Sequence, residues 1–448
     1  MIEFFILIIF ITLAFAVASI VLGARYDMPP VYMAKQMMKQ GILGAMDILV
    51  QLCDPVKAKT RPATVEPADG QSFNDEDYYM LTEEFFRKAK LSKTFHMEKI
   101  CNETIRTSRF HFSYQPYDEP VLLELRKAYN LDDVVAPAKD EFEAMLLLRN
   151  WGRSQFRRND YQPRMAYFNA LKILRKNIRN KNSEPHTPDQ YRPCHFFPLF
   201  YSQILLSMGY TPRIVRISGS AARGYDGYDG HGMTEVWSNK FRKWILMDPD
   251  LNLHYEKDGI PVNMLEIHNE RYESDISEIK AVQGKQTSGD FQNRKKIDIS
   301  SMIEYHSYIQ IVDMRNDWLT NHYFKGHPKR SNKATLFWID KNLPSVFNFK
   351  QKTDNADDFY WTLNQTEILA NQFLHGKTWS LAFKTFTPNY KHFEITIDDL
   401  KKIVLKESVY AWDLHHGRNR LSVCSVNKFG IHGLSASVEI WADRKDFG

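Results

Sequence analysis

The stretch that decides the fold is RPCHFFPLFYSQILLSMGYTPRIVRISG, which runs from Arg192 to Gly219. Its large apolar side chains recur at the spacing of a helix that packs on a core; they are Phe197, Phe200, Tyr201, Ile204 and Met208. Pro198 fits only the first turn of a helix, where its missing N–H group had no partner to lose. We therefore expect a helix that begins at or just beyond Cys194 and ends at Gly209, followed by a strand.

A cysteine at the start of a helix has chemical consequences. The positive end of the helix dipole and the unpaired backbone N–H groups both favour the thiolate of Cys194. The same N–H groups can hold a developing oxyanion. Taken alone, Cys194 would be more typical of an inert buried thiol, so its companions in the sequence decide the interpretation.

The first companion is a histidine in GYDGYDGHGMTEVW, from Gly224 to Trp237. The glycines let the chain bend close to the helix, and His231 opens an alternating, strand-like segment. A two-residue turn at Asn239 and Lys240 would pair that strand with WILMD and set His231 opposite Asp248, with Cβ atoms about 5 Å apart. The carboxylate would then fix the imidazole tautomer, which completes a nucleophile, base and orienting acid.

The sequence pattern around these residues resembles that of the transglutaminase-like superfamily, a branch of the papain-like fold. The resemblance is to a bacterial-type, membrane-anchored member of that superfamily. That family has a cysteine opening a helix that ends in Gly, a Pro-Arg-aliphatic strand, a His-x-x-x-Glu-Val-aromatic strand and an aromatic-rich strand ending in Asp-Pro. The corresponding positions are Cys194, Gly209, Pro212 with Arg213, His231 to Trp237, and Trp244 to Pro249. The match extends over about 140–252. The bulky residues His195 to Pro198 depart from the small or polar residues that the family carries there.

The resemblance implies acyl transfer on a protein or peptide amide. Cys194 would attack the carbonyl carbon, His231 would carry the proton, and Asp248 would hold His231. The acyl-enzyme would then pass to an amine or to water. Four further residues are candidates for the site. Gln190 would hold the oxyanion, and Trp151 would line the cleft. Tyr225 and Tyr228 would either line the cleft or be exposed turn aromatics.

No cofactor or metal is expected. The four cysteines lie far apart without metal-type spacing. Asp226 and Asp229 lack the EF-hand pattern for calcium. The chain has 59 Lys and Arg against 54 Asp and Glu, spread without basic blocks, so a nucleic-acid partner is not expected.

The segment Phe4–Gly23 is uncharged and long enough for a helix to cross a membrane. Because no Lys or Arg precedes it, a retained single-pass anchor is favoured over a cleaved signal peptide. Three following cations favour a cytoplasmic flank but leave the side of the membrane open; they are Arg25, Lys35 and Lys39. Residues 33–52 form a Met-rich segment that either lies on the bilayer surface or packs on the soluble part.

The expected fold class is α+β. A papain-like, transglutaminase-like core would pack the cysteine helix on an antiparallel sheet that carries His231 and Asp248. The chain would divide into an anchor (1–24), a juxtamembrane helical segment and linker (25–95), a transglutaminase-like domain (96–296) and an Ig-like β-sandwich domain (297–448). The sandwich is expected from alternating segments between about 331 and 441, such as ATLFWID, FYWTLNQ and TWSLAFKTF.

Binding without catalysis is the alternative function. The papain-like cleft or the β-sandwich could bind a protein or glycan partner without turnover. The bulky HFFP segment after Arg192 and the large C-terminal region favour this alternative. The set of three side chains, Cys194, His231 and Asp248, favours the enzyme.

Overall fold

The computed structural model describes residues 77–89, 95–155, 169–180, 196–218, 230–273, 276–285, 305–319, 335–340 and 351–443. The expected anchor Phe4–Gly23 and the segment 33–52 lie outside these residues. Among the helices in the described ranges, none has the length and apolarity that crossing a bilayer requires.

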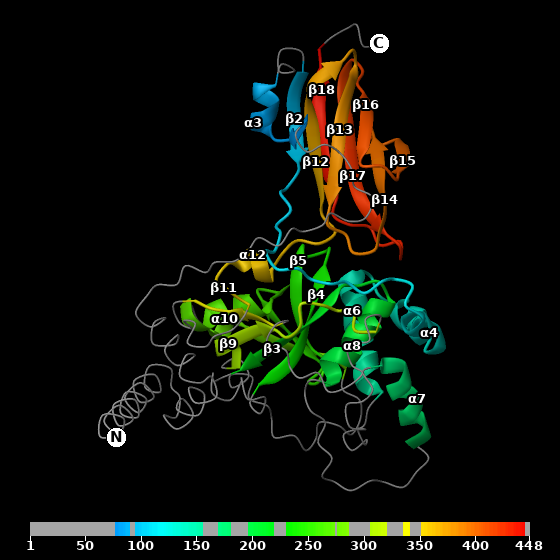
Figure 1. Cartoon of the computed structure of the whole chain (residues 1–448), viewed down its shortest axis with the longest axis vertical. Coiled ribbons are helices and arrows are strands. Elements are labelled where there is room, and N and C mark those ends of the chain that lie inside the picture. The colour runs from blue at the N-terminus through cyan, green and yellow to red at the C-terminus, as the bar shows by residue number, and fades with distance from the viewer. Residues whose placement is uncertain are drawn as a thin grey trace, which may run out of the picture.

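The chain forms two regions, which Figure 1 shows one above the other. The central region combines one large sheet with most of the helices, and the two-sheet region is an elongated body of two antiparallel sheets. The fold is therefore mixed α+β, with few helices and mostly antiparallel pairing. The expected class is confirmed at this level.

The central region is built on a nine-stranded sheet in the order β11-β10-β9-β3-β4-β5-β6-β7, with β8 paired to β6. Its strands are β3 (Pro212–Ser218), β4 (His231–Ser238), β5 (Lys243–Asp248), β6 (Leu253–Lys257), β7 (Ile260–Pro261), β8 (Lys280–Gln283), β9 (Tyr308–Ile311), β10 (Leu336–Trp338) and β11 (Lys352–Thr353). The strands expected after Gly209 and from His231 to Trp237 are confirmed as β3 and β4.

One face of this sheet is covered by helices α4 (Pro120–Ala128), α5 (Leu131–Val135), α6 (Glu141–Ser154), α7 (Ala170–Asn180) and α8 (Phe196–Ser207). Val236, Ile245 and Met247 of β4 and β5 pack in that layer with the helical side chains. α6 begins where the side chain of Asp140 accepts a hydrogen bond from the Glu143 N–H, as an N-cap does. α8 is followed by Gly209 at φ 87°, a left-handed conformation that glycine adopts without strain.

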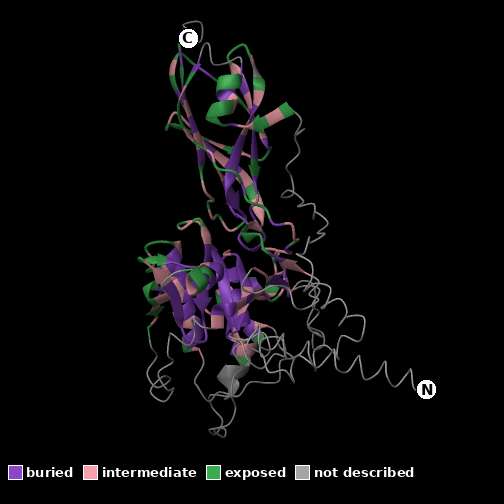
Figure 2. Cartoon of the chain, turned by 90° about the vertical axis from the view of Figure 1, so that its left-hand side faces the viewer, coloured by how far each residue is buried: buried purple, intermediate pink, exposed green. Residues whose placement is uncertain are grey.

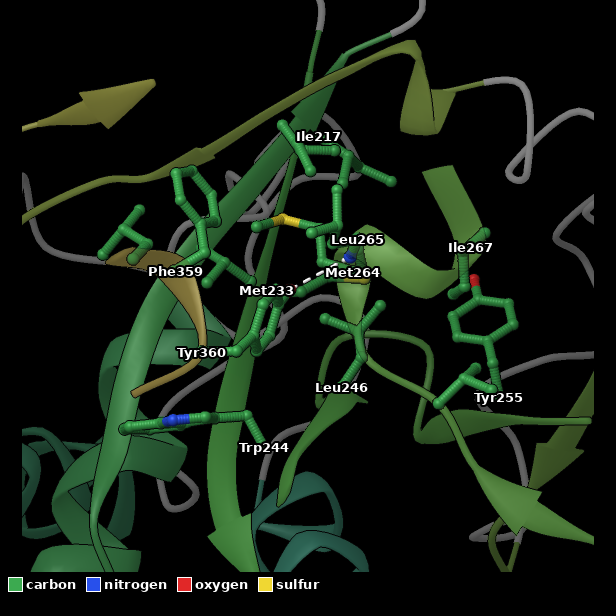
Figure 3. Close-up of a cluster of buried hydrophobic side chains, with 14 of the residues drawn as sticks. Ile217, Met233, Trp244, Leu246, Tyr255, Met264, Leu265, Ile267, Phe359 and Tyr360 are labelled. Carbon is green, nitrogen blue, oxygen red and sulfur yellow. Dashed lines mark hydrogen bonds between the residues drawn. The ribbon is translucent and has the colours of Figure 1, made fainter. Parts of the chain in front are cut away.

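The other face is covered by α10 (Met264–Glu273), α12 (Ala356–Phe359) and the short helices η3 (Ile276–Glu278) and η4 (Tyr305–Ser307). Figure 3 shows Met233 and Leu246 of the sheet packed with Met264, Leu265 and Tyr360 on this side. Alternate residues of β4 and β5 therefore serve two separate cores, as the period of a strand requires.

The two-sheet region contains a four-stranded sheet, β1-β12-β13-β16, and a five-stranded sheet, β15-β14-β17-β18-β2. Its elements are β1 (Tyr78–Met80), α3 (Glu83–Lys88), β2 (Phe95–Cys101), β12 (Thr366–His375), β13 (Thr378–Thr385), β14 (Tyr390–Ile397), β15 (Lys401–Leu405), β16 (Val409–Asp413), β17 (Gly417–Asn427) and β18 (Ala436–Ala442). The inner faces share one apolar core, with Trp379 and Phe383 from one sheet and Ile395, Val423 and Ile440 from the other. Figure 2 shows buried residues along these faces and throughout the central region.

Strand pairing crosses the boundaries expected at residues 95 and 296. β1 and β2 pair with β12 and β18 in the two-sheet region. β9 and β10 pair with each other and extend the central sheet from β3. The segments ATLFWID and FYWTLNQ thus belong to β10 and to α12 with its following loop, and not to the two-sheet region, which begins again at Thr366. An alternating pattern therefore did not guarantee a strand in FYWTLNQ, and it left the partner of the strand in ATLFWID undetermined.

Candidate functional site

The centre of the candidate site is a hydrogen bond between His231 and Asp248. Nε2 of His231, the first residue of β4, lies 2.7 Å from Oδ2 of Asp248, the last residue of β5. The Asp248 side chain is 0% exposed and the His231 side chain 12% exposed. The structure therefore brings these two sequence-predicted residues together, with the imidazole nearer the surface.

The predicted strand register was wrong by two residues. Trp237 pairs with Trp244, and Ser238 pairs with Lys243, so the turn contains four residues instead of two. The turn is held open by α6, because a carboxylate oxygen of Glu141 accepts hydrogen bonds from the Lys240 N–H and from the Ser238 hydroxyl. A shift of two residues keeps side chains on the same face. His231 and Asp248 are therefore diagonal neighbours and still meet.

Asp248 is held by the chain that follows it. Its second oxygen, Oδ1, accepts a hydrogen bond from the Leu251 N–H at 2.9 Å. With both oxygens engaged, the carboxylate has a fixed orientation toward His231. The bond places the Nε2 proton of a neutral imidazole on the Asp248 side, so Nδ1 is the nitrogen that a base function would use.

α8 runs along β4 with its first turn toward the His231 end of the strand. The Thr234 hydroxyl donates to the Pro198 carbonyl at 3.2 Å, and the Trp237 N–H donates to the Thr211 carbonyl at 3.1 Å. The start of the helix is thus level with the middle of β4, and its end is level with Trp237.

A buried arginine from α6 supports the loop after β5. Arg149, which is 1% exposed, donates from Nε to Asn252 Oδ1 at 3.1 Å, and its Nη1 lies 3.2 Å from His254 Nδ1. Burial lowers the pKa of Arg149 to about 10, although the Asp248 carboxylate acts in the opposite direction, so the guanidinium stays cationic at neutral pH. The Arg149 guanidinium therefore supports the loop that follows Asp248 from inside the helical layer.

A second arginine ties three segments of the site together. Arg153, near the end of α6, donates from Nε to the Asp250 carbonyl at 3.1 Å. Its guanidinium carbon lies 5.2 Å from the ring centroid of Phe197 in the first turn of α8. The end of α6, the start of α8 and the loop after Asp248 are held to one another by this side chain.

Sequence reasoning missed both arginines. The signal for them was present, because Arg149 and Arg153 are four residues apart and flank Gly152, on the face of α6 that also carries the apolar residues Met145 and Leu148. An arginine in the apolar stripe of a helix needs a buried partner. That requirement could have pointed to the neighbouring loop.

The remaining candidates have other places. The half-buried Trp151 packs its ring on Tyr129, with centroids 5.8 Å apart, within the helical layer. Cys194, Gln190, Tyr225 and Tyr228 lie outside the described residues.

Two other histidines near the site have structural contacts. His254 is buried, and burial together with the charge of Arg149 lowers its pKa, which favours the neutral ring. His268 is buried between the His306 carbonyl and Asp340. Over the described ranges, no group of three or more His, Cys, Asp or Glu side chains is placed to hold a metal ion.

Comparisons of the chain with protein-family models and with curated proteins found no match. The interpretation of the site therefore depends on its residues and their geometry.

Proposed function

We propose that this chain is a cysteine acyl-transferase or hydrolase of the transglutaminase-like superfamily that acts on protein or peptide amides. The observation that carries the proposal is the His231–Asp248 hydrogen bond of 2.7 Å, with the carboxylate fully buried. An ordinary exposed ion pair contributes little to stability and needs no such burial. A buried carboxylate that orients a partly exposed imidazole is the arrangement that a general base requires.

The nucleophile in this proposal is Cys194. It precedes the described start of α8 by two residues, and the first turn of α8 lies beside β4, the strand that begins with His231. The dipole of α8 and its first N–H groups would stabilise a thiolate at this position.

The reaction proceeds by two acyl transfers. Sγ of Cys194 attacks the amide carbonyl carbon, while backbone N–H groups at the start of α8 and the candidate Gln190 hold the oxyanion. The C–N bond then breaks, and the imidazolium of His231 gives its proton to the departing amine. An amine or a water molecule, deprotonated by His231, attacks the thioester carbonyl and releases Cys194. Asp248 orients the imidazole and stabilises its protonated form throughout.

The finer architecture belongs to the same proposal. The central region is a papain-like, transglutaminase-like core, with α8 packed on the antiparallel strands that carry His231 and Asp248. The two-sheet region is an Ig-like β-sandwich, supported by its two facing antiparallel sheets and shared apolar core. The segment Phe4–Gly23 anchors the chain in a membrane as a single span.

Alkylation by iodoacetamide tests the assignment of Cys194. The background is the full-length chain with the other three cysteines, Cys53, Cys101 and Cys424, replaced by serine. We expect the rate at pH 6 to exceed that of a model thiol at least about tenfold, because an activated thiol has a pKa well below the usual value of about 8.5. Replacing His231 with Ala should remove this excess, whereas His96→Ala, a change at an exposed histidine, should preserve it.

The opposite result has a clear meaning. If Cys194 reacts at the rate of a model thiol across the pH range and His231→Ala changes nothing, the chain has no activated nucleophile. The function would then be that of a binding protein without turnover.

A further inference from the structure

A cavity of about 400 Å³ lies where the two regions meet. Its walls come from the segment 106–118 before α4, from Trp361 after α12, from the loop 386–390 between β13 and β14, and from Lys428 after β17. The volume is within the range of about 300 to 1,000 Å³ that is typical of small-molecule sites.

A cluster of aromatic side chains lines one part of the cavity. Phe112 lies 4.9 Å from Tyr114 and 5.4 Å from Trp361, measured between ring centroids. Phe386 lies 5.7 Å from Tyr114 in an edge-to-face contact. Because these rings fix one another, the cavity has a preformed apolar surface suited to a flat ring.

Two cations line the cavity and are exposed to solvent, Arg106 and Lys428. Nζ of Lys428 lies 4.6 Å from the ring centroid of Tyr117. The other ionisable lining groups with exposed side chains are His111 and Asp118. Two permanent positive charges against one carboxylate favour an anionic group at this edge of the cavity.

Three of the neutral polar side chains of the walls are engaged within the protein, whereas the buried Tyr390 hydroxyl has no hydrogen-bond partner among the described residues. The Ser108 hydroxyl donates to the Asp358 carbonyl, and the Asn389 amide binds the Tyr117 N–H and the Gln115 carbonyl. The Thr387 hydroxyl is in a chain with Thr385 and Ser425.

We propose that this cavity binds an aromatic carboxylate, with the ring among Phe112, Tyr114 and Phe386 and the carboxylate beside Lys428 and Arg106. The same chemistry is offered by a small aryl acid and by a polypeptide that ends in an aromatic residue. Charge complementarity and the aromatic walls select this class over neutral and non-aromatic ligands.

The cavity is separate from the candidate catalytic pair. Trp361 packs on Trp244, which pairs with Trp237 near the C-terminal end of β4, whereas His231 is the first residue of that strand. Six residues of strand separate the two places by about 20 Å. Binding in the cavity is therefore independent of Cys194 chemistry, and the Cys194→Ala chain should bind the ligand as the unaltered chain does.

Calorimetric titration of the full chain tests the proposal. The probes are N-acetylphenylalanine, its neutral amide and N-acetylglycine. We expect saturable binding of N-acetylphenylalanine that is about tenfold tighter than that of the amide, since one charge-assisted contact is lost in the amide. N-acetylglycine, which lacks the ring, should not bind measurably.

A matched pair of variants locates the site. Lys428→Met should abolish most of the preference for the acid over the amide, while Lys402→Met, at an exposed lysine of β15, should preserve it. Phe386→Ala should weaken both ligands. Absence of saturable binding, equal affinity for acid and amide, or a preference that survives Lys428→Met would each overturn the proposal.

A last comparison distinguishes the two sources of the ligand. A ten-residue peptide with a C-terminal phenylalanine is titrated as the free acid and as the amide. Binding of the peptide acid with the same sensitivity to Lys428→Met assigns the site to polypeptide ends. Binding of N-acetylphenylalanine alone assigns it to small aryl acids.

Discussion

The two regions differ in the kinds of side chain that they bury. The central region buries acidic, basic and histidine side chains to 1% exposure or less, namely Arg149, Arg213, Glu235, Asp248, His254, His268, His306 and Asp358. The two-sheet region packs an apolar core of tryptophan, phenylalanine and aliphatic side chains between its sheets. Buried charge is costly unless it is paired, and it gathers where a protein orients functional groups. The two regions therefore differ in how much buried charge their cores must pair.

The buried ion pair of Arg213 and Glu235 shows how the central region pairs charge inside its core. Nη2 and Nε of Arg213 lie 2.6 and 3.0 Å from Oε2 of Glu235. The guanidinium carbon is 4.1 Å from the ring centroid of Trp244. The second carboxylate oxygen accepts hydrogen bonds from the Met264 N–H and the Tyr360 hydroxyl. One ion pair thus joins β3 and β4 to α10 and to the residue that follows α12.

An arginine-to-methionine substitution in each region should give the largest difference in stability between the two regions. Arg213→Met would leave Glu235 buried without its cation, so we expect a loss of about 3–5 kcal/mol in the free energy of unfolding. Arg418→Met removes an exposed partner of Glu439 in the two-sheet region and should change the free energy of unfolding far less, because water screens an exposed pair. Urea unfolding curves measure both changes. Equal losses would show that burial of charge does not distinguish the regions.

The contact between the regions is tested by a glycine pair. A Cβ on Gly209 would lie 2.6 Å from Phe429, whereas a Cβ on Gly430 would meet nothing within 4 Å. Both residues have positive φ, 87° and 81°. We expect Gly430→Ala to cost about 1 kcal/mol from backbone strain alone and Gly209→Ala about 2–3 kcal/mol, because it adds a clash.

Thermal unfolding of the two glycine variants gives the comparison directly. A difference between them measures the packing of the end of α8 against the two-sheet region. Identical melting temperatures would mean that Phe429 moves away at no cost.

The smallest expected effect is on the pH dependence of stability. Burial raises the pKa of Asp313 in the central region to about 7. Between the unfolded value of about 3.9 and pH 7 the folded chain binds more protons, so this group lowers stability as the pH rises through that window. Asp313→Asn should therefore stabilise the chain by about 1–2 kcal/mol at pH 8 and have little effect at pH 4.

For Glu439 in the two-sheet region we expect the opposite change of stability with pH. The hydrogen bond from Arg418 holds the pKa of Glu439 below its usual range, so its contribution is present at neutral pH and is lost as the pH falls. Glu439→Gln should destabilise at pH 8 and not at pH 3. Melting temperatures of both variants at the two pH values measure the signs, and equal signs would contradict the assignment.

The sequence predicted the parts of the site that depend on local pattern. The apolar stripe of α8, the stop at Gly209 and the alternation of β3 to β5 are local properties, and they sufficed to place His231 and Asp248 on one face. The turn length was not predictable, because Glu141 from a distant helix sets it. The partners of Arg149 and Arg213, and the pairing of β10 with β9, depend on contacts between segments far apart in the sequence.

The order in which the chain visits the two regions has a mechanical consequence. β1 and β2 are edge strands of the two facing sheets, and the chain reaches the central region only after both. A force applied through the residues before Asp77 is taken up by the hydrogen bonds of β1 with β12 and of β2 with β18 before it reaches α4. If the N-terminal segment is tethered, the two-sheet region bears the load and the His231–Asp248 pair is shielded from tension.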